Sequence, residues 1–355
     1  MSGKTDLLTL FLPEIQALFA QENLPKFRAA QVYGWLMKGA GFDEMKNLPA
    51  ALRAQLAENW DAGTVRILEV FESRKDETKK FLFALSDGNI VEGVLMRYHY
   101  GSTLCISSQV GCKMGCAFCA STLDGCVRNL TCGEMLHMVL LVNRRYEQQD
   151  RRGVTNIVIM GSGEPLDNYD QVIRFLRLVS APEGIAVSPR NISLSTCGLV
   201  PEIYRLMQED LPITLAISLH APNDDIRSQI MPISRRFSMQ ELMGACVEYT
   251  RRTKRRIVFE YALIDRLNNS QQHARQLAAL LRGMMCHVNL IPLNRVEERR
   301  LMPSAKEQTD AFLKTLTALG ISATVRREMG SDIQGACGQL RRRYLSQKES
   351  EPSGG

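Results

Sequence analysis

Cysteines gather in one short stretch of the chain, with a spacing suited to binding a metal cluster. Cys105 is followed by Cys112, Cys116 and Cys119, the last three in the pattern C-x3-C-x2-C. Cysteine thiolates hold iron–sulfur clusters, usually four per cubane. A set of three leaves one iron without a protein ligand, and an open coordination position is where a metal site does chemistry. The alternative is a structural zinc site, but zinc motifs usually contain paired C-x2-C elements, and the sequence has no second pair.

Polar residues follow several of the later apolar segments. The turn GSGEP contains small residues, such as Gly163, that let a backbone approach a ligand. Its Glu164 carboxylate can accept hydrogen bonds from an ammonium group. Further polar residues follow later strand candidates; they are Ser195, Ser218, His220 and Asn294. Each of them alone would more often be a cap or turn residue, and a lone histidine is usually structural. Because they follow successive strand candidates, we expect them together to surround one cavity.

A further cysteine lies far along the chain. Cys337 stands between small residues in GSDIQGACGQL, after the last apolar segment. A buried cysteine is usually an inert small hydrophobe, but the neighbouring glycines favour an accessible, adaptable loop. Cys337 is therefore a candidate for chemistry outside the triplet.

The segments that must position these residues alternate between two kinds from about residue 102 onward. Strand candidates cover 155–161, 190–196, 212–219, 255–264, 287–294 and 321–328, and helical patterns cover 133–148, 169–180, 238–250 and 271–284. This order predicts an α/β fold with a parallel sheet and right-handed crossovers, forming a complete or partial barrel. Chemistry in such folds gathers at the carboxyl ends of the strands, where the cysteine triplet and the polar residues fall.

The chain before this region differs in character. Residues 7–60 have a helical pattern, and one helix is expected to carry Phe27, Val32, Trp35 and Leu36 on one side. Residues after this segment are rich in β-formers, and Asp-Gly between two runs predicts a hairpin. The predicted organisation is an N-terminal helical module (1–62), a connecting β element (63–101), a core barrel (102–328), a loop that carries Cys337 (329–343) and a flexible tail (344–355).

Composition places the chain among soluble globular proteins. Its 355 residues are 45% hydrophobic and 23% charged, and no run approaches the ~18 apolar residues of a spanning helix. The N-terminal LLTLFLPEIQALFA is interrupted by Pro13 and Glu14 and predicts an amphipathic helix instead of a signal peptide. Without an export signal, ten cysteines indicate a reducing compartment, so we expect a cytoplasmic protein with no membrane association.

Basic residues are bunched although the net charge is only +6. Such clusters favour phosphate contacts that position a nucleic acid without reading its sequence. Any single cluster is as easily a solvated surface, but together they indicate RNA as a partner. The clusters are Arg235 and Arg236; Arg251, Arg252, Lys254, Arg255 and Arg256; and Arg341, Arg342 and Arg343.

The cysteine triplet and the GSGEP turn resemble the radical S-adenosylmethionine (SAM) superfamily. The resemblance implies that Cys112, Cys116 and Cys119 hold a [4Fe-4S] cluster whose fourth iron takes the amino and carboxylate groups of SAM. It also implies a set of cofactor-binding residues near that cluster. These are Gly163 and Glu164 for the amino group, together with Ser195, Ser218, Leu219, His220 and Asn294.

The combination TLCISSQVGC, GSGEP, LSTCG, SLHAPND, IPLN and DIQGACGQL resembles the RlmN-type adenine-C2 RNA methyltransferases, over residues 25–343. This implies a radical SAM (βα)6-type partial barrel that methylates C2 of an adenosine in 23S rRNA and in tRNA. By resemblance, Cys337 carries the methyl group, Cys105 is its disulfide partner, and Glu92 is a proton acceptor; which of Cys105 and Glu92 removes the C2 proton stays open. The resemblance also implies two SAM per turnover, an electron donor such as flavodoxin or ferredoxin, and a monomer.

Two alternatives remain at this point. The related Cfr-type enzymes methylate C8 of the same rRNA nucleotide, but GEP in place of GEA, together with HAPND, favours the C2 branch. A non-catalytic RNA-binding protein with a structural iron–sulfur or zinc site belongs to a different class. The chain departs from the family pattern at Cys126, where relatives more often carry an aromatic residue, and at Ser162, which replaces a common methionine. Cys126, Cys132, Cys197, Cys246 and Cys286 are expected to serve packing.

Overall fold

The computed structural model describes residues 3–147, 153–294, 296 and 298–333. A ten-stranded sheet forms its centre, in the spatial order β14-β13-β12-β11-β10-β9-β6-β5-β4-β3. The strands are β3 (Arg66–Glu72), β4 (Lys79–Ala84), β5 (Ile90–Tyr98), β6 (Gly101–Ile106), β9 (Asn156–Ile159), β10 (Ile192–Thr196), β11 (Thr214–Ser218), β12 (Ile257–Leu263), β13 (Cys286–Pro292) and β14 (Ala323–Val325).

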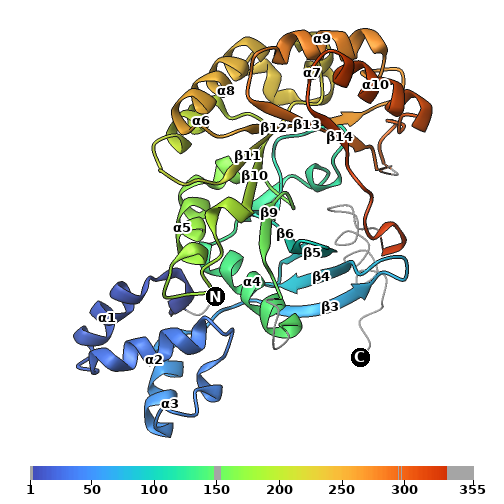
Figure 1. Cartoon of the computed structure of the whole chain (residues 1–355). Coiled ribbons are helices and arrows are strands. Elements are labelled where there is room, and N and C mark those ends of the chain that lie inside the picture. Colours follow the sequence, from blue (N-terminus) through green and yellow to red (C-terminus); the bar gives the residue numbers. More distant parts are fainter. Residues whose placement is uncertain (1–2, 148–152, 295, 297, 334–355) are drawn as a thin grey trace.

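Seven of the strands in the described chain, β6 and β9 to β14, are parallel and curve into a partial barrel. Helices connect them and cover the outer face (Figure 1), and the prediction of an α/β fold with a parallel, partly closed sheet is confirmed. These helices are α4 (Cys132–Tyr146), α5 (Tyr169–Ser180), α6 (Val200–Leu206), α7 (Asp224–Ile230), α8 (Met239–Thr253), α9 (Gln271–Leu281) and α10 (Lys306–Ala318).

Local sequence explains where these helices begin and which face they bury. Thr131 caps α4 by accepting from the N–H of Glu134, whose carboxylate in turn accepts from the N–H of Thr131. This reciprocal capping box satisfies two backbone donors that the helix leaves unpaired. Helix α5 buries Val172, Phe175 and Val179 against the sheet, a spacing of three and four residues that keeps one apolar stripe facing the core.

Three antiparallel strands, β3, β4 and β5, extend the sheet beyond β6. The β4–β5 turn contains the predicted Asp87-Gly88 pair, and Gly88 has φ +83, a conformation that favours glycine. On the outermost strand, the pairing register of β3 with β4 shifts between Ile67 and Glu69. The extension places Glu92, on β5, next to the first strand of the barrel.

The N-terminal helices α1 (Leu12–Gln21), α2 (Lys26–Leu36) and α3 (Ala50–Asn59) form a small module at one side of the barrel (Figure 1). The predicted apolar side of α2 is partly wrong: Phe27 is 58% exposed. The helix instead buries Ala29, Val32, Tyr33 and Leu36. At about 100° per residue, Phe27 points away from the side on which these four residues converge.

Ion pairs and hydrogen bonds fasten this module to the barrel. Arg174 of α5 bonds the carboxylate of Glu14 (2.5 Å) and the backbone oxygen of Thr9 (2.7 Å). Arg144 of α4 pairs with Glu44 and donates to the backbone oxygen of Gly39 (2.8 Å). The module is therefore held in a defined position beside the barrel.

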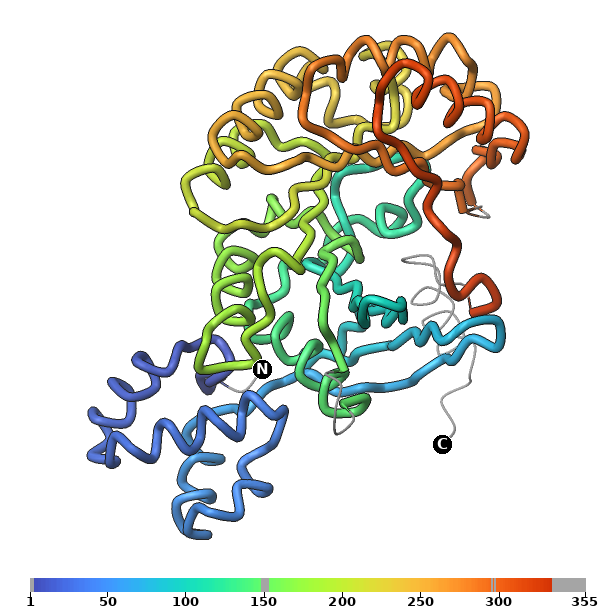
Figure 2. The backbone as a smooth tube through the Cα atoms, viewed as in Figure 1, coloured from blue at the N-terminus to red at the C-terminus, as the bar shows by residue number. Residues whose placement is uncertain are grey.

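Residues 326–333, here called the closing segment, join the two edges of the sheet. They leave β14 and run to the turn between β3 and β4 (Figures 1 and 2). There Asp332 accepts from Ser73 Oγ (2.6 Å) and from the N–H of Arg74 (2.7 Å), and Gly330 donates its N–H to Asp76 (3.0 Å).

Among the described helices, none combines the length and apolar character needed to cross a membrane.

Candidate active site

The cysteine triplet lies in a loop after the short strand β7 (Gln109–Gly111), at the carboxyl end of the barrel. The N–H of Cys112 donates to the backbone oxygen of Gly125 (2.8 Å). Glycine is required at the preceding position, Gly111, because a Cβ there would lie only 2.0 Å from the same oxygen. The hydroxyl of Thr122 donates to the backbone oxygens of Cys116 (3.2 Å) and Cys119 (2.9 Å). The loop is therefore shaped by its own backbone bonds.

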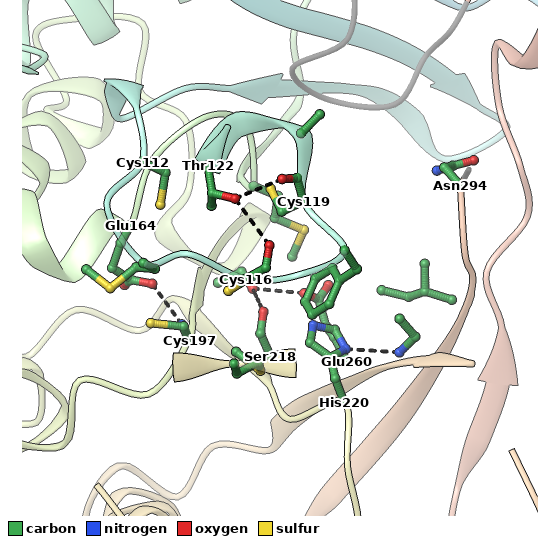
Figure 3. Close-up of a pocket in the computed structure, with 18 of the residues that line it drawn as sticks. Cys112, Cys116, Cys119, Thr122, Glu164, Cys197, Ser218, His220, Glu260 and Asn294 are labelled. Carbon is green, nitrogen blue, oxygen red and sulfur yellow. Dashed lines mark hydrogen bonds between the residues drawn. The ribbon is translucent and has the colours of Figure 1, made fainter. Parts of the chain in front are cut away.

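A cavity of about 280 Å³ opens above the strand ends, and all three thiols of the triplet line it (Figure 3). Sites for small ligands commonly have volumes of this order, roughly 300 Å³ or more. We call it the cluster cavity. Its lining includes Cys112, Cys116, Cys119, Phe118, Gly163, Glu164, Ser195, Cys197, Ser218, His220, Glu260, Asn294 and Arg326.

Burial disfavours the ionised form of these thiols when they stand alone. It raises the pKa of Cys112 to about 12, with Cys119 adding to the shift, and it raises the pKa of Cys116 as well. The buried guanidinium of Arg227 opposes the shift at Cys116. A metal cluster would supply the positive charge that keeps such thiols deprotonated.

The donor set fits a cluster better than a single zinc ion. Within the described residues, no three His, Cys, Asp or Glu side chains converge on one metal position. Yet Cys112, Cys116 and Cys119 face one cavity, and Cys119 raises the pKa of both Cys112 and Cys116. Thiolates that each bind a different iron of a cubane need not converge on one point, whereas the ligands of one zinc ion must.

Arg227 organises the strand ends behind the cysteine loop. Its side chain is fully buried and donates to three backbone oxygens, those of Cys197 (2.6 Å), Ser218 (3.2 Å) and Leu219 (3.1 Å). Hydrogen bonds to carbonyl groups offset part of the cost of burying a charge. The guanidinium thus ties the ends of β10 and β11 together under the cavity.

Glu164 is the buried carboxylate of the cavity. Its two oxygens accept from the N–H groups of Leu166 (3.1 Å) and Cys197 (2.8 Å), and its own N–H donates to Gln109 (2.9 Å). Burial raises the pKa of Glu164, and the backbone donors oppose the shift. The side chains of Thr196 and Cys197 also hydrogen-bond the carboxylate. A carboxylate at a cavity wall is an acceptor that fits an ammonium ligand such as the amino group of SAM.

Gly163 has a packing reason as well as a place in the cavity. Its φ is +107, and a Cβ there would lie 2.6 to 2.7 Å from atoms of Ser108 and Gln109. The sequence interpretation assigned the small residue to ligand approach. The structure adds that glycine is needed for the turn to close against the end of β6.

Glu260 was missed by the sequence analysis. The Oε2 atom of Glu260 accepts a hydrogen bond from the hydroxyl of Ser195 (2.9 Å). Because the Ser195 hydroxyl has only one proton, Ser218 must be the donor in the second bond, between the two serine hydroxyls (3.3 Å). The Oε1 atom is buried and, in the described chain, has no hydrogen-bond partner. An orphaned buried acceptor at the cavity wall fits a ligand that brings hydroxyl groups, as the ribose of SAM does. The signal was a single carboxylate inside the apolar strand IVFEYAL.

His220 is both a cavity residue and a structural one. Its Nδ1 accepts from the N–H of Ala262 (2.9 Å), and its ring meets Phe118 edge to face at 4.7 Å. Burial lowers the pKa of His220 to about 3, so the ring is neutral at physiological pH with its proton on Nε2. Asn294 lies across the cavity (Figure 3).

Leu219 is the one predicted cofactor residue that is absent from the described cavity wall. Its side chain is fully buried. Its backbone N–H donates to the backbone oxygen of Glu260, and its own backbone oxygen accepts from the guanidinium of Arg227. Cys197 was expected to serve only core packing, but it lines the cavity.

A second group of predicted residues lies beside the cavity, on the inner face of the antiparallel extension. Glu92 is buried and forms an ion pair with the fully buried Lys80 (3.1 Å). Cys105, opposite Val94 in the sheet, packs in a small apolar cluster that Met329 of the closing segment also contacts. The predicted methyl carrier Cys337 lies outside the described residues.

The largest basic cluster is placed away from the cavity. It ends α8 and precedes β12, at the amino ends of the parallel strands. Arg251 pairs with Glu248, Arg252 with Gln208, and Arg255 donates to the backbone of Ile213. Three of its five basic residues thus have partners within the fold, on the face opposite the cavity, which the charge pattern alone could not indicate.

Two family models match the sequence. The model described as the Radical SAM superfamily matches residues 106–277, and the ribosomal RNA large subunit methyltransferase N-terminal domain matches residues 5–61. A curated protein from Alkaliphilus metalliredigens, "Probable dual-specificity RNA methyltransferase RlmN", is 51% identical over 349 residues, covering 98% of both chains. One of the same name from Clostridium botulinum is 49% identical over 346 residues, covering 97% of this chain and 99% of the relative.

A solved structure is also similar throughout. The crystal structure of a radical SAM methyltransferase from Sphaerobacter thermophilus matches with a TM-score of 0.91 and 43% identity, covering 94% of this chain and 98% of that one. The likeness therefore includes the N-terminal helices, the antiparallel extension and the barrel.

Proposed function

Because the chain belongs to the RlmN family of dual-specificity RNA methyltransferases, we propose that it methylates C2 of an adenosine in 23S rRNA and of the adenosine 3′ of the tRNA anticodon. The proposed domain roles follow the sequence: residues 1–62 dock RNA, 63–101 connect, 102–328 form the catalytic barrel, and 329–343 carry the methyl group. We further propose that the enzyme works as a monomer in the cytoplasm.

One observation carries the proposal. Cys105, which the triplet does not use, lies in the same apolar cluster as Met329, and Met329 is in the chain segment that leads to Cys337. The segment is held there by Asp332 at the β3–β4 turn. A thiol partnership between residues so distant in sequence distinguishes this methyl transfer from other radical SAM chemistry.

The cofactor set has matching side chains in the cluster cavity. Cys112, Cys116 and Cys119 would hold a [4Fe-4S] cluster, and Glu164 would hold the amino group of SAM. When bound, these groups supply the methyl group and the radical that the weakly nucleophilic C2 atom requires. We propose two SAM per turnover and an electron donor such as flavodoxin or ferredoxin.

The remaining residues would handle the substrate. Glu92 or Cys105 would accept the proton that leaves C2, since both groups lie on the inner face of the extension. Cys105 would then release the product by forming a disulfide with Cys337, which a thiol reductant must reduce before the next turnover. Ser195, Ser218, His220 and Asn294 would orient the cofactor.

The decisive test is an anaerobic assay of reconstituted protein with SAM, a reductant, and unmodified 23S rRNA or tRNA transcripts. We expect 2-methyladenosine by mass spectrometry of the digested RNA, and S-methylcysteine at Cys337 in the digested protein. Cys337→Ala should abolish methylation, and Cys105→Ala should accumulate a covalent protein–RNA adduct. An 8-methyl product would identify Cfr-type chemistry. If neither 5′-deoxyadenosine nor S-methylcysteine forms, the enzyme proposal fails.

A further inference from the structure

A second cavity lies inside the barrel, directly beneath the cluster cavity. It has a volume of about 270 Å³, and its wall carries polar side chains from the strands, including Asn156, Thr214 and Asn289. We call it the lumen cavity. Three residues, Met160, Glu260 and Arg326, line both cavities. The interior is therefore hollow and polar through this depth, unlike the packed interior of a closed eight-stranded barrel.

Arg326 is the cation at the boundary between the two cavities. It follows β14, the edge strand of the sheet, and its N–H bonds the oxygen of Leu290 (2.8 Å), which holds the backbone in strand register. Its side chain is partly buried, and within the described chain the guanidinium forms no hydrogen bond or ion pair. An arginine placed in a cavity wall without a partner is available for a ligand.

The lumen cavity, and not the cluster cavity, has the charge balance that favours an anion at Arg326. In the cluster cavity Arg326 is the one permanent cation among the described lining residues, and two carboxylates, Glu164 and Glu260, share that lining. In the lumen cavity two arginines, Arg190 and Arg326, face one carboxylate, Glu260. A guanidinium presents a fork of donors that matches the two oxygens of a phosphate.

A target adenosine must leave its stack to reach the cluster cavity, and it brings a phosphate on each side. We propose that Arg326 binds a backbone phosphate next to the target adenosine and so fixes how deeply the nucleotide enters the barrel. The inference rests on the proposed function, because it takes RNA as the substrate. Arg326 is a substrate-binding residue that the sequence motifs do not mark.

The neighbouring residue provides a matched control. Arg327 is exposed and is absent from the described lining of both cavities. Arg326→Gln and Arg327→Gln remove the same charge from adjacent positions, so general electrostatic attraction falls equally in both. Melting temperatures of both variants establish that the fold is intact, and Arg326→Lys tests whether charge alone is enough.

The test is a binding cycle with the reconstituted holoenzyme and a synthetic RNA hairpin that carries the target adenosine. Each phosphate flanking the target is replaced in turn by a neutral methylphosphonate. For wild type, one replacement should weaken binding about tenfold, and Arg326→Gln should weaken binding of unmodified RNA about equally, as expected for a charge-assisted bond. In Arg326→Gln that replacement should have no further effect. Arg327→Gln should retain the full response.

Two results would overturn the inference. The first is that Arg326→Gln binds unmodified RNA within twofold of wild type, and the second is that it responds to methylphosphonate as wild type does. A loss of SAM affinity without a change in RNA affinity would assign the guanidinium to the cofactor's carboxylate instead. If wild-type holoenzyme produces no methylated RNA, the proposed function fails, while the binding cycle still decides the phosphate contact.

Discussion

The ammonium of Lys80 lies 3.1 Å from the carboxylate of Glu92, and neither side chain is more than 5% exposed. Removing one member of a buried ion pair leaves the other charge uncompensated. We therefore expect Lys80→Met to lower the free energy of unfolding by about 3 to 5 kcal/mol, measured by denaturant unfolding, and to reduce methylation because Glu92 loses its orienting partner.

The adjacent Lys79 is the control for Lys80. Its ion pair with Glu72 is at the surface, with 59% of the Glu72 side chain exposed, so Lys79→Met should change stability by less than about 1 kcal/mol. The double variant Lys80→Met, Glu92→Gln should lose less than the sum of the two single losses. Strict additivity would show that the pair is not coupled.

Each cysteine of the triplet should be required for the metal. Reconstituted wild-type protein should bind about four iron atoms per chain, and Cys112→Ala, Cys116→Ala and Cys119→Ala should each lose most of the iron and the visible absorption of the cluster. Cys126→Ser is the matched control, since Cys126 is only partly buried and is absent from the cavity lining. Iron loss in Cys126→Ser would mean that a fourth thiol participates.

Glu164→Gln should lower SAM affinity. Its two carboxylate oxygens accept from two backbone N–H groups, and glutamine offers only one acceptor oxygen and no negative charge for an ammonium group. We expect a fall of at least tenfold in SAM affinity, measured by equilibrium binding to the reconstituted protein. Glu202→Gln, outside the cavity on α6, should bind SAM normally. Unchanged affinity of Glu164→Gln would remove Glu164 from the cofactor site.

Asp332→Ala should release the closing segment without unfolding the barrel. The hydrogen bonds to Ser73 and Arg74 hold the pKa of Asp332 below its usual value, so its carboxylate is charged at neutral pH. Amide exchange in residues 329–333 should become faster, and methylation should fall several-fold while SAM affinity stays constant. Asp310→Ala, on exposed α10 surface, provides the comparison. Equal exchange in both variants would argue against an anchoring role.

Asp6 makes the stability of the N-terminal module depend on pH. Burial raises the pKa of Asp6 to about 6, above the 3.8 that is ordinary for an aspartate. The folded state therefore binds the proton more tightly than the unfolded state, and this stabilisation is present below about pH 4 and is lost as pH rises through 6. Asp6→Asn should gain roughly 2 to 3 kcal/mol relative to wild type between pH 4 and pH 7. Denaturant unfolding of both proteins from pH 4 to pH 7 measures this gain, and a stability difference that stays constant over that range would contradict it.

Sequence patterns predicted most of the elements because local spacing determines them. The helix at 169–180 has the predicted bounds, since a three-to-four residue apolar period depends only on neighbours in the chain. The exposure of Phe27 on α2 could not be predicted from local spacing, because the face of a helix that becomes buried depends on the elements that pack against it.

Buried charges were the main omission at the site. Lys80 and Glu260 lie within apolar strands, and nothing local distinguishes a buried charge from one at a strand edge. Their significance comes from partners across the sheet: Glu92 for Lys80, and Ser195 for Glu260. Arg326 was missed for the same reason, since the wall that it joins is assembled from strands far apart in sequence.

The register shift on β3 bears on how molecules of this protein behave toward one another. Within the described chain, β3 is an outer strand of the sheet, and an exposed regular edge invites a strand from another molecule to pair with it. The irregular pairing between Ile67 and Glu69 interrupts the row of backbone donors and acceptors, and exposed Arg66 and Glu72 place charges along it. Edge-to-edge aggregation through β3 is thereby discouraged at the high concentrations used for anaerobic reconstitution.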